Sequence, residues 1–266
     1  MNNVNVTIVT VCFNAGATIA ATIESVLRQD YRDFEYLIVD GLSTDNTMDI
    51  VRNYEQKFAD RGIQFRYISE KDGGIFDAMN KAADNALGSW IEYMNADDKF
   101  HSDTVLSEVF ACDVSDADVI YGDTVRIREG VGSFGKALPV ENINLNMPFC
   151  HQSSFVKTSV MRDRRFDLKY RVADYNFFLR LYKDGGKFKR VDVTIADYSL
   201  EGFSNENKYK TYLGTLEIKH DLGMINKNSF KQKLKNIYFK QLLDDKALCH
   251  GLISAFDRMV KGKKRN

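Results

Sequence analysis

The sequence has few cysteines, no excess of charge of either sign and no long apolar run, and each shortage excludes a class of protein. Its 266 residues include four cysteines, none in a CxxC pair and none with a histidine at zinc-ligand spacing. This pattern favours reduced thiols in the cytoplasm over a disulfide framework or a zinc site. The 37 basic residues balance the 37 acidic residues, so the chain has no global footprint for nucleic-acid binding.

Segments that would enter a membrane are also missing. The first 23 residues carry no charged side chain, but a basic n-region is absent and Asn14-Ala15-Gly16 interrupts the apolar run, so we reject a signal peptide. No uninterrupted apolar stretch is long enough to span a bilayer. We therefore predict a cytoplasmic protein that is either soluble or peripheral at the inner face of the membrane.

The balanced charge is unevenly distributed along the chain. From Lys227 to the C-terminus, eleven basic residues stand against three acidic ones, a net charge of +8, which leaves −8 for residues 1–226. Between Phe230 and Val260, apolar residues recur at three- to six-residue steps with lysines between them. Such basic amphipathic helices either lie in the plane of a membrane surface or pack on the rest of the protein with a solvated basic face. We expect one α/β domain over residues 1–204 and a basic helical extension over residues 205–266.

Short apolar runs alternate with helical spacing through the first 120 residues. The predicted strands lie at residues 4–13, 34–40, 63–69, 89–94 and 118–121, and the predicted helices at 18–29, 46 onward, 75–86 and 103–111. This alternation predicts right-handed βαβ crossovers and a mostly parallel sheet flanked by helices. Beyond residue 122 the pattern predicts a hairpin or mixed-sheet region at 124–128, a helix at 172–182, a strand at 191–195 and helices beyond 208.

Carboxylates follow two of these strands. Asp40 ends one strand, and Asp97 and Asp98 follow another in "YMNADDKF". Ligands of parallel sheets bind beyond the carboxyl ends of the strands, so all three carboxylates should face one crevice. Neighbouring carboxylates raise each other's pKa unless a cation or solvent separates them, and the pair therefore indicates a metal site or an exposed acidic turn.

Four stretches together resemble the family 2 glycosyltransferases of GT-A fold, especially the bacterial enzymes that build surface polysaccharides. They are residues 6–51, "SEKDGGIFDAMNKAADNALGSWIEYMNADD" at 69–98, "HQSSFVKTSVM" at 151–161 and "RVADYNFFLRLYKDGG" at 171–186. The resemblance covers roughly residues 4–200, with the motifs in the family's order. It implies a glycosyltransferase of hexosyltransferase type with a GT-A domain.

The resemblance implies a site for the nucleotide of a sugar donor. In the family, the carboxylate that matches Asp40 accepts a hydrogen bond from the imide N–H of uracil, which favours a UDP-sugar over a cytidine donor. Guanine also presents N–H donors, so a GDP-sugar is disfavoured by the resemblance alone. The backbone at Val11 and the ring of Phe13 would flank the base, and Asp72 would lie near the donor. The alternatives are loop or helix capping for Asp40, a core position for Phe13 and ordinary turn chemistry for Asp72 and its glycines.

Asp97 and Asp98 match the family's DxD-type motif, whose hard oxygen ligands suit Mn²⁺ or Mg²⁺ on a diphosphate. Asn95 stands in place of the first aspartate. The sequence therefore leaves open which carboxylate binds the metal and which acts through water or a sugar hydroxyl. Asp97 is accordingly a candidate for both metal and donor binding.

The resemblance makes Asp174 the general base and places His151 and Gln152 on the acceptor side. Without it, Asp174 is equally a charge at a helix start and His151 a buried histidine. The glutamine-arginine-tryptophan signature of processive relatives is absent, and "SLEGFSNENKYK" stands there instead. We therefore expect inverting transfer of a single sugar to a hydroxyl of a glycan or lipid-linked acceptor.

Two other functions compete with this interpretation. A sugar-1-phosphate nucleotidyltransferase needs a Gly- and Arg-rich loop after its first strand, whereas "CFNAGATIA" has one glycine and no basic residue. A catalytically silent nucleotide-sugar or glycan-binding module is disfavoured because every candidate carboxylate is present.

Overall fold

The computed structural model describes residues 4–200, 208–238 and 240–241. The described residues fall into two compact units, one within residues 1–206 and the other beyond residue 206. Each unit is described by itself.

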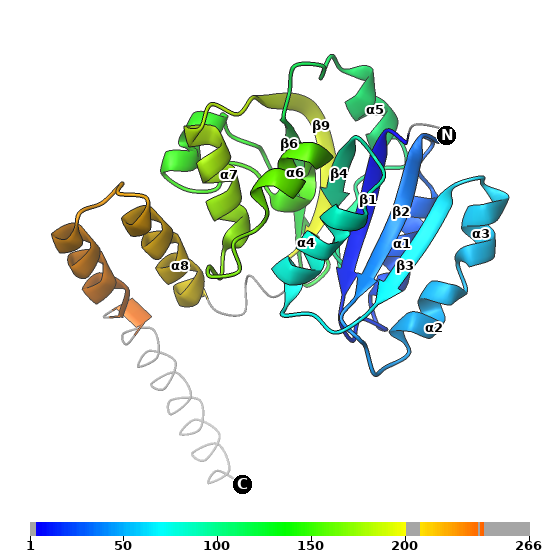
Figure 1. The fold of residues 1–266 in the computed structure, drawn as a ribbon, viewed down its shortest axis with the longest axis horizontal. Helices are drawn as coiled ribbons and strands as arrows, with labels where there is room; N and C mark the ends of the chain where they lie inside the picture. Colours follow the sequence, from blue (N-terminus) through cyan, green and yellow to red (C-terminus); the bar gives the residue numbers. More distant parts are fainter. Residues whose placement is uncertain (1–3, 201–207, 239, 242–266) are drawn as a thin grey trace, which may run out of the picture. The chain divides into compact units, whose positions relative to one another are not determined.

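The first unit is built on one nine-stranded sheet with helices on both faces (Figure 1). The strands are β1 Val6–Cys12, β2 Phe34–Asp40, β3 Gln64–Ser69, β4 Trp90–Tyr93, β5 Lys99–Phe100, β6 Val119–Arg128, β7 Val131–Gly135, β8 Ser154–Lys157 and β9 Phe188–Ser199. They are ordered β3-β2-β1-β4-β8-β6-β9-β5, with β7 paired to β6. All residues of β1, β2 and β4 are buried, as the continuous apolar runs predict for strands covered on both faces.

The α/β class is confirmed, and the sheet is entirely parallel in its first half and mixed in its second half. The pairs β1–β2, β2–β3 and β1–β4 are parallel. Beyond β4, the pairs of β8 with β4 and β6 are antiparallel, β6–β9 is parallel, and β5–β9 and β6–β7 are antiparallel. The predicted hairpin at 124–128 is the β6–β7 ribbon.

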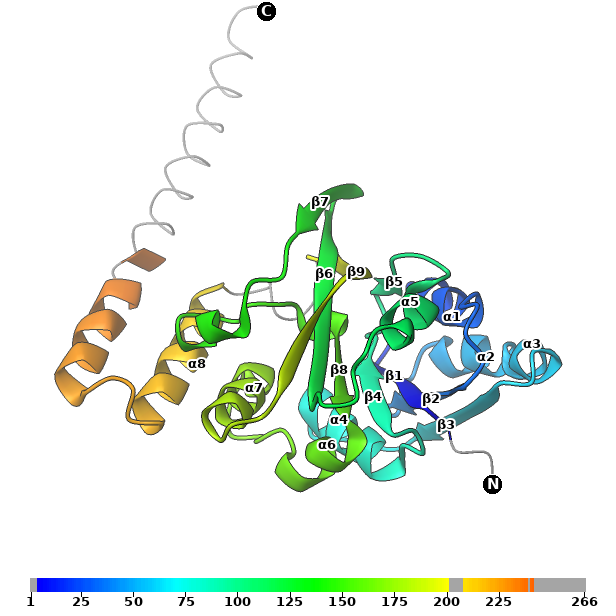
Figure 2. The same cartoon turned by 90° about the horizontal axis from the view of Figure 1, so that it is seen from above.

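Helices cover the two faces of the sheet in two groups, as Figure 2 shows. The helices of this unit are α1 Ile19–Leu27, α2 Thr47–Arg52, α3 Glu55–Asp60, α4 Ile75–Asn85, α5 Val105–Ala111, α6 Thr158–Arg164 and α7 Ala173–Lys183. One face carries α1, α2, α3 and α5, and the other carries α4, α6 and α7. Two short 3₁₀ turns, Val140–Asn144 and His151–Ser153, lie between β7 and β8.

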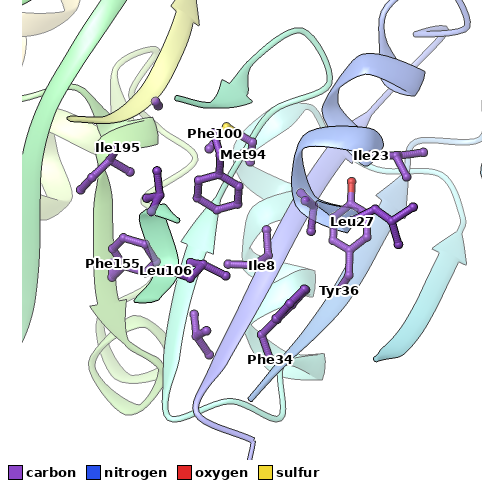
Figure 3. Close-up of a cluster of buried hydrophobic side chains, with 14 of the residues drawn as sticks. Ile8, Ile23, Leu27, Phe34, Tyr36, Met94, Phe100, Leu106, Phe155 and Ile195 are labelled. Carbon is purple, nitrogen blue, oxygen red and sulfur yellow. The ribbon is translucent and has the colours of Figure 1, made fainter. Parts of the chain in front are cut away.

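A cluster of buried hydrophobic side chains lies between the sheet and the face that carries α1, α2, α3 and α5 (Figure 3). Trp90 and Met94 belong to this core, and Tyr93 points to the opposite face, where its ring lies 5.9 Å from that of Phe166. By the two-residue period of a strand, Glu92 shares the core face with Trp90 and Met94. Each buried large apolar side chain contributes roughly 1.5–3 kcal/mol.

Three predicted elements differ from the structure in extent. The strands expected at 118–121 and 124–128 form one strand, β6, because the chain continues through a bulge at Gly122 and Asp123. A Cβ at Gly122 would lie 2.4 Å from the Val193 carbonyl oxygen, so only glycine allows β9 to pass this closely. The helix expected from residue 46 is divided into α2 and α3 by a turn at Asn53 and Tyr54.

The second unit contains α8, Lys208–Asp221, and a further helix at 227–238. The rings of His220 and Phe230 lie 4.6 Å apart, and Leu234 and Ile237 are half-buried. None of the described helices is both long and apolar enough to cross a bilayer. The later apolar positions of the predicted amphipathic pattern lie outside the described residues: Leu242, Leu248, Leu252, Phe256 and Val260.

Candidate active site

The candidate residues follow neighbouring strands at one edge of the sheet. Cys12 is in register with Asp40 across β1 and β2, and Asp40 is in register with Ser69 at the end of β3. The Met94 N–H, just beyond β4, donates to the Val9 carbonyl of β1. Because these strands are parallel, Phe13, Asp40 and the Asp97-Asp98 pair share this edge, as the sequence predicts.

The Asp40 side chain is more deeply buried than the predicted contact with the nucleotide base implies. It is 0 % exposed. Its Oδ1 accepts from the Ser43 hydroxyl, its Oδ2 accepts from the Ser69 hydroxyl at 2.6 Å, and the Ser43 N–H lies 3.1 Å from Oδ2. The carboxylate thus ties the loop after β2 to the end of β3, and its oxygens already have protein donors.

Asp72 approaches the same edge from the turn after β3. A Cβ added at Gly41 would lie 2.6 Å from Oδ2 of Asp72 and 3.5 Å from the Phe13 ring. Phe13 is 64 % exposed, which excludes the core position that the sequence left open. The Val11 side chain is buried in β1, so only its backbone is available to a ligand. The Asp72 carboxylate, the exposed Phe13 ring and the bare Cα of Gly41 therefore lie together at this edge of the sheet.

Asp97 is exposed, whereas Asp98 is 1 % exposed. Oδ1 of Asp98 accepts the Ser199 N–H at 2.8 Å, while Oδ2 has no hydrogen-bond partner among the described residues. The buried Oδ1 of Asn95, on the same loop, is also without a partner in the described chain. Burial, and then the charge of Asp97, raise the pKa of Asp98 well above its ordinary value. A buried carboxylate oxygen without a donor, beside a second carboxylate, suits a cation.

This loop would supply only part of a metal's coordination shell. Within residues 4–200 and 208–241, no three His, Cys, Asp or Glu side chains are grouped so that they could hold a metal ion. Mg²⁺ commonly takes one or two protein carboxylates and completes its shell with phosphate and water oxygens. The residues present fit a cation of this kind, shared with a diphosphate.

His151 and Gln152 lie on the 3₁₀ turn before β8. The His151 ring is buried against the rings of Tyr93, Phe166 and Phe178, and its Nε2 has no partner among the described residues. Burial lowers the pKa of His151, and the charge of Asp174 acts in the opposite direction. The histidine is therefore a neutral side chain close to Asp174.

Gln152 faces the predicted metal loop. The Gln152 side chain lowers the pKa of the Asp98 carboxyl. The Cys150 thiol lies 3.0 Å from Oε1 of Gln152. The sequence predicted an acceptor-side position for Gln152 and offered no signal for Ser199, which meets Asp98 through a contact between distant segments.

Asp174 is half-buried in the first turn of α7. Burial raises the pKa of the Cys150 thiol, and the charges of Asp98 and Asp174 raise it further. Both carboxylates are therefore near enough to the Cys150 thiol for their charges to act on it.

Residues 7–182 match the family model for glycosyl transferase family 2. The chain belongs to this family. Over 217 residues, this family 2 glycosyltransferase is 31 % identical to a PGL/p-HBAD biosynthesis glycosyltransferase of Mycobacterium bovis (strain BCG / Pasteur 1173P2), across 79 % of this chain and 83 % of the relative. It is 38 % identical over 98 residues to the putative teichuronic acid biosynthesis glycosyltransferase TuaG of Bacillus subtilis (strain 168), across 37 % and 38 % of the two chains.

Solved structures share the fold of this family 2 glycosyltransferase. S. aureus TarS 1-349 in complex with UDP-GlcNAc aligns with a TM-score of 0.65 at 18 % identity, over 89 % of this chain and 73 % of TarS 1-349. The mannosyltransferase PcManGT from Pyrobaculum calidifontis, in complex with GDP-Man and Mn²⁺, aligns with a TM-score of 0.63 at 15 % identity, over 84 % and 65 % of the two chains. The GT-A fold predicted from the sequence is confirmed.

Proposed function

We propose that this glycosyltransferase transfers one sugar from a UDP-sugar to a hydroxyl of a glycan or lipid-linked acceptor in surface polysaccharide biosynthesis, with inversion and with a divalent cation. The observation that carries the proposal is the buried Oδ2 of Asp98, which has no hydrogen-bond partner among the described residues and lies beside exposed Asp97 at the sheet edge that also holds Phe13. The printed names of the relatives, which concern PGL/p-HBAD and teichuronic acid biosynthesis, support a glycan product.

Asp97 and Asp98 would hold Mn²⁺ or Mg²⁺. A cation bound there would neutralise the charge that develops on the departing UDP. The Ser199 N–H, which donates to Oδ1 of Asp98, holds that carboxylate in place from the protein side. Support for a cation also comes from PcManGT, whose complex contains Mn²⁺.

For the nucleotide, we assign the base contact to Asp72 and give Asp40 a positioning role. Asp40 has protein donors on both oxygens, whereas Oδ2 of Asp72 lies over Gly41 beside the exposed Phe13 ring. A carboxylate accepts from the N3–H of uracil and repels the N3 lone pair of cytosine, so this arrangement selects uridine. The Phe13 ring and the Val11 backbone would flank the base.

Asp174 is the proposed general base, with His151 beside it on the acceptor side. Its carboxylate accepts the proton of the acceptor hydroxyl, the freed oxygen bonds to the anomeric carbon, and the bond from that carbon to the UDP oxygen breaks with its electron pair. A single displacement of this kind inverts the anomeric centre. Burial lowers the pKa of His151, which makes its ring a weaker proton acceptor than an ordinary imidazole.

Assays of UDP release with mixed UDP-sugars and acceptors test this function. Asp97→Ala and Asp98→Ala should each abolish transfer while the fold remains intact, because the diphosphate loses its counter-charge. Full activity of both variants in chelator would remove the metal assignment. Release of pyrophosphate would identify a nucleotidyltransferase, and donor binding without any UDP release would identify a silent module.

The extension remains a separate part of the proposal. We assign the catalytic domain to residues 1–204 and a basic extension to residues 205–266, which would contact an anionic membrane surface from the cytoplasmic side. The boundary between the two compact units, after residue 206, supports this division.

A further inference from the structure

The exposed Phe13 ring belongs to a turn with an uncommon backbone conformation. Phe13 directly follows the buried strand β1 and is 64 % exposed. Asn14, the next residue, has a φ of 50°, in the left-handed region, which asparagine adopts more readily than most residues with a side chain. The chain therefore turns sharply directly after an apolar ring that the fold leaves in solvent.

Two hydrogen bonds join this turn to the loop after β2, in opposite directions. The Asn14 N–H donates to the Ser43 hydroxyl oxygen at 2.7 Å. The Thr44 N–H donates to Oδ1 of Asn14 at 2.8 Å. The peptide group between Phe13 and Asn14 is thus held through its N–H, and the Asn14 side chain is held through its oxygen.

The buried Asp40 carboxylate determines the direction of the bond to Ser43. A carboxylate can only accept, so the Ser43 hydroxyl donates its proton to Oδ1 of Asp40 and leaves its lone pairs for the Asn14 N–H. Oδ2 of Asp40 accepts the Ser69 hydroxyl at 2.6 Å, which holds the carboxylate from β3. A series of hydrogen bonds therefore runs from the end of β3 to the peptide group that follows Phe13.

The same loop also meets the residue before Phe13. The Gly41 N–H donates to the Cys12 carbonyl at 2.9 Å. A Cβ added at Gly41 would lie 3.5 Å from Cδ2 of Phe13, an ordinary contact distance, so the ring lies beside the start of this loop. Because both neighbours of Phe13 are bonded to the loop, the backbone of Phe13 cannot shift without breaking one of these hydrogen bonds.

We infer that Asn14 and Ser43 are positioning residues for the nucleotide base: their hydrogen bonds hold the backbone of Phe13 so that its ring is already in place when uracil binds. A side chain that is ordered before binding loses less conformational freedom in the complex, and affinity rises accordingly. The buried Asp40 then acts on the base through Ser43 and Phe13. This inference rests on the proposed function, because it assumes that Phe13 flanks the base of a UDP-sugar.

The test removes each hydrogen bond separately. Asn14→Gly keeps the left-handed backbone and loses the amide, and Ser43→Ala loses the acceptor of the Asn14 N–H, whereas Ser43→Thr keeps it. Binding of UDP, measured by calorimetry on the full chain, should weaken about 3- to 10-fold in Asn14→Gly and in Ser43→Ala, the scale of ordering one side chain. Ser43→Thr should stay close to the wild type. Asn53→Gly, on the exposed turn between α2 and α3, is the matched control and should leave UDP binding unchanged.

A double-mutant cycle separates positioning of the ring from a general effect on stability. In a Phe13→Ala background, Asn14→Gly and Ser43→Ala should have no further effect on UDP binding, because the ring that they hold is gone. Thermal unfolding without ligand, recorded for each variant, reports any loss of stability. Losses that add to the loss in Phe13→Ala, or a Ser43→Thr variant as weak as Ser43→Ala, would overturn the inference.

Phe13→Ala also distinguishes this inference from the proposed function. If Phe13→Ala weakens UDP binding while Asn14→Gly and Ser43→Ala keep the wild-type affinity, the base site stands and the positioning role fails. If Phe13→Ala binds UDP as the wild type does, or the wild type does not bind UDP, the proposed base site and this inference fail together.

Discussion

The Asp72 carboxylate lies over the bare Cα of Gly41, and its Oδ1 accepts the Gly74 N–H at 2.8 Å. A Cβ at Gly41 would come within 2.6 Å of Oδ2 of Asp72, so Gly41→Ala should displace that carboxylate. We expect Gly41→Ala and Asp72→Ala to weaken UDP binding by the same amount, roughly 1–3 kcal/mol. Asp72→Asn should also narrow the preference for UDP over CDP, because an amide can donate to the N3 of cytosine. Calorimetric titration with both nucleotides measures these effects.

Gly73→Ala is the control for that experiment. A Cβ at Gly73 would lie at an ordinary distance of 3.6 Å from its nearest neighbour, Oδ2 of Asp77. The turn that carries Asp72 and Gly73 should therefore tolerate the added methyl group. If Gly41→Ala and Asp72→Asn bind UDP normally while Asp40→Asn does not, Asp40 is the residue that contacts the base, as the family resemblance implied.

Asp174 is tested by a substitution that keeps its shape. Asp174→Asn removes the proton acceptor, and loss of a general base typically slows turnover about 10²- to 10⁴-fold, with UDP affinity little changed. As a helix-start residue alone, asparagine would serve as well as aspartate. Near-wild-type turnover in Asp174→Asn would place the base elsewhere and refute the mechanism proposed here.

Residues that end parallel strands were predictable from sequence, because strand ends meet at one edge. The positions of Asp40, Asp97 and Asp98 follow from that rule. The hydrogen bond from the Ser69 hydroxyl to Asp40 was not predictable, since the two residues are 29 positions apart and meet only through the register of β2 with β3. The hydrogen bond from the Ser199 N–H to Asp98 depends likewise on contact between segments that are far apart in the sequence.

Within the strand β4, Glu92 is a carboxyl group in the apolar core. It is fully buried, and neither oxygen has a hydrogen-bond partner among the described residues. Burial, and then the charge of Asp98, raise the pKa of Glu92 well above its ordinary value of 4.5. The folded state therefore binds a proton that the unfolded state releases. The contribution of Glu92 to stability is fully present below pH 4.5 and is lost as the pH rises through the raised folded-state pKa.

Glu92→Gln removes this proton linkage while keeping the shape of the side chain. The free energy of unfolding of the wild type should include a term that declines from about pH 4.5 upward, and Glu92→Gln should lack that term. Denaturant titrations across the pH range measure it, with exposed Glu141→Gln as the control that should keep the wild-type profile. Identical profiles for the wild type and Glu92→Gln would show that Glu92 has a polar partner in solution.

Helices and strands whose apolar residues recur at a clear spacing were predictable from the sequence. The second half of the sheet shows why other elements were not. Helices α1, α4 and α7 lie within two residues of their predicted bounds. The two-residue strand β5 is too short to show a period, and the order of β8, β6 and β9 is set by tertiary pairing. The strand β6 continues through a bulge at Gly122, where the local sequence predicts a turn.

At the scale of the whole molecule, the charge is divided between the two parts of the chain. Residues 1–226 carry −8 and residues 227–266 carry +8. Lys231, Lys233 and Lys235 are exposed on the helix at 227–238. Basic residues near an anionic lipid surface contribute about 1 kcal/mol each, and salt weakens this contribution.

The final prediction therefore concerns binding of the full chain to vesicles that contain phosphatidylserine. Replacing Lys231, Lys233 and Lys235 together with glutamine should weaken binding by up to about 3 kcal/mol at low salt, and less at high salt. The control replaces Lys183, Lys187 and Lys189, which are exposed on the first unit, and should leave binding unchanged because it alters the total charge equally but not the extension. Equal losses in the two variants would mean that only net charge matters. If the wild type does not bind these vesicles at low salt, the basic helices serve packing alone, since electrostatic attraction to an anionic surface is strongest under that condition.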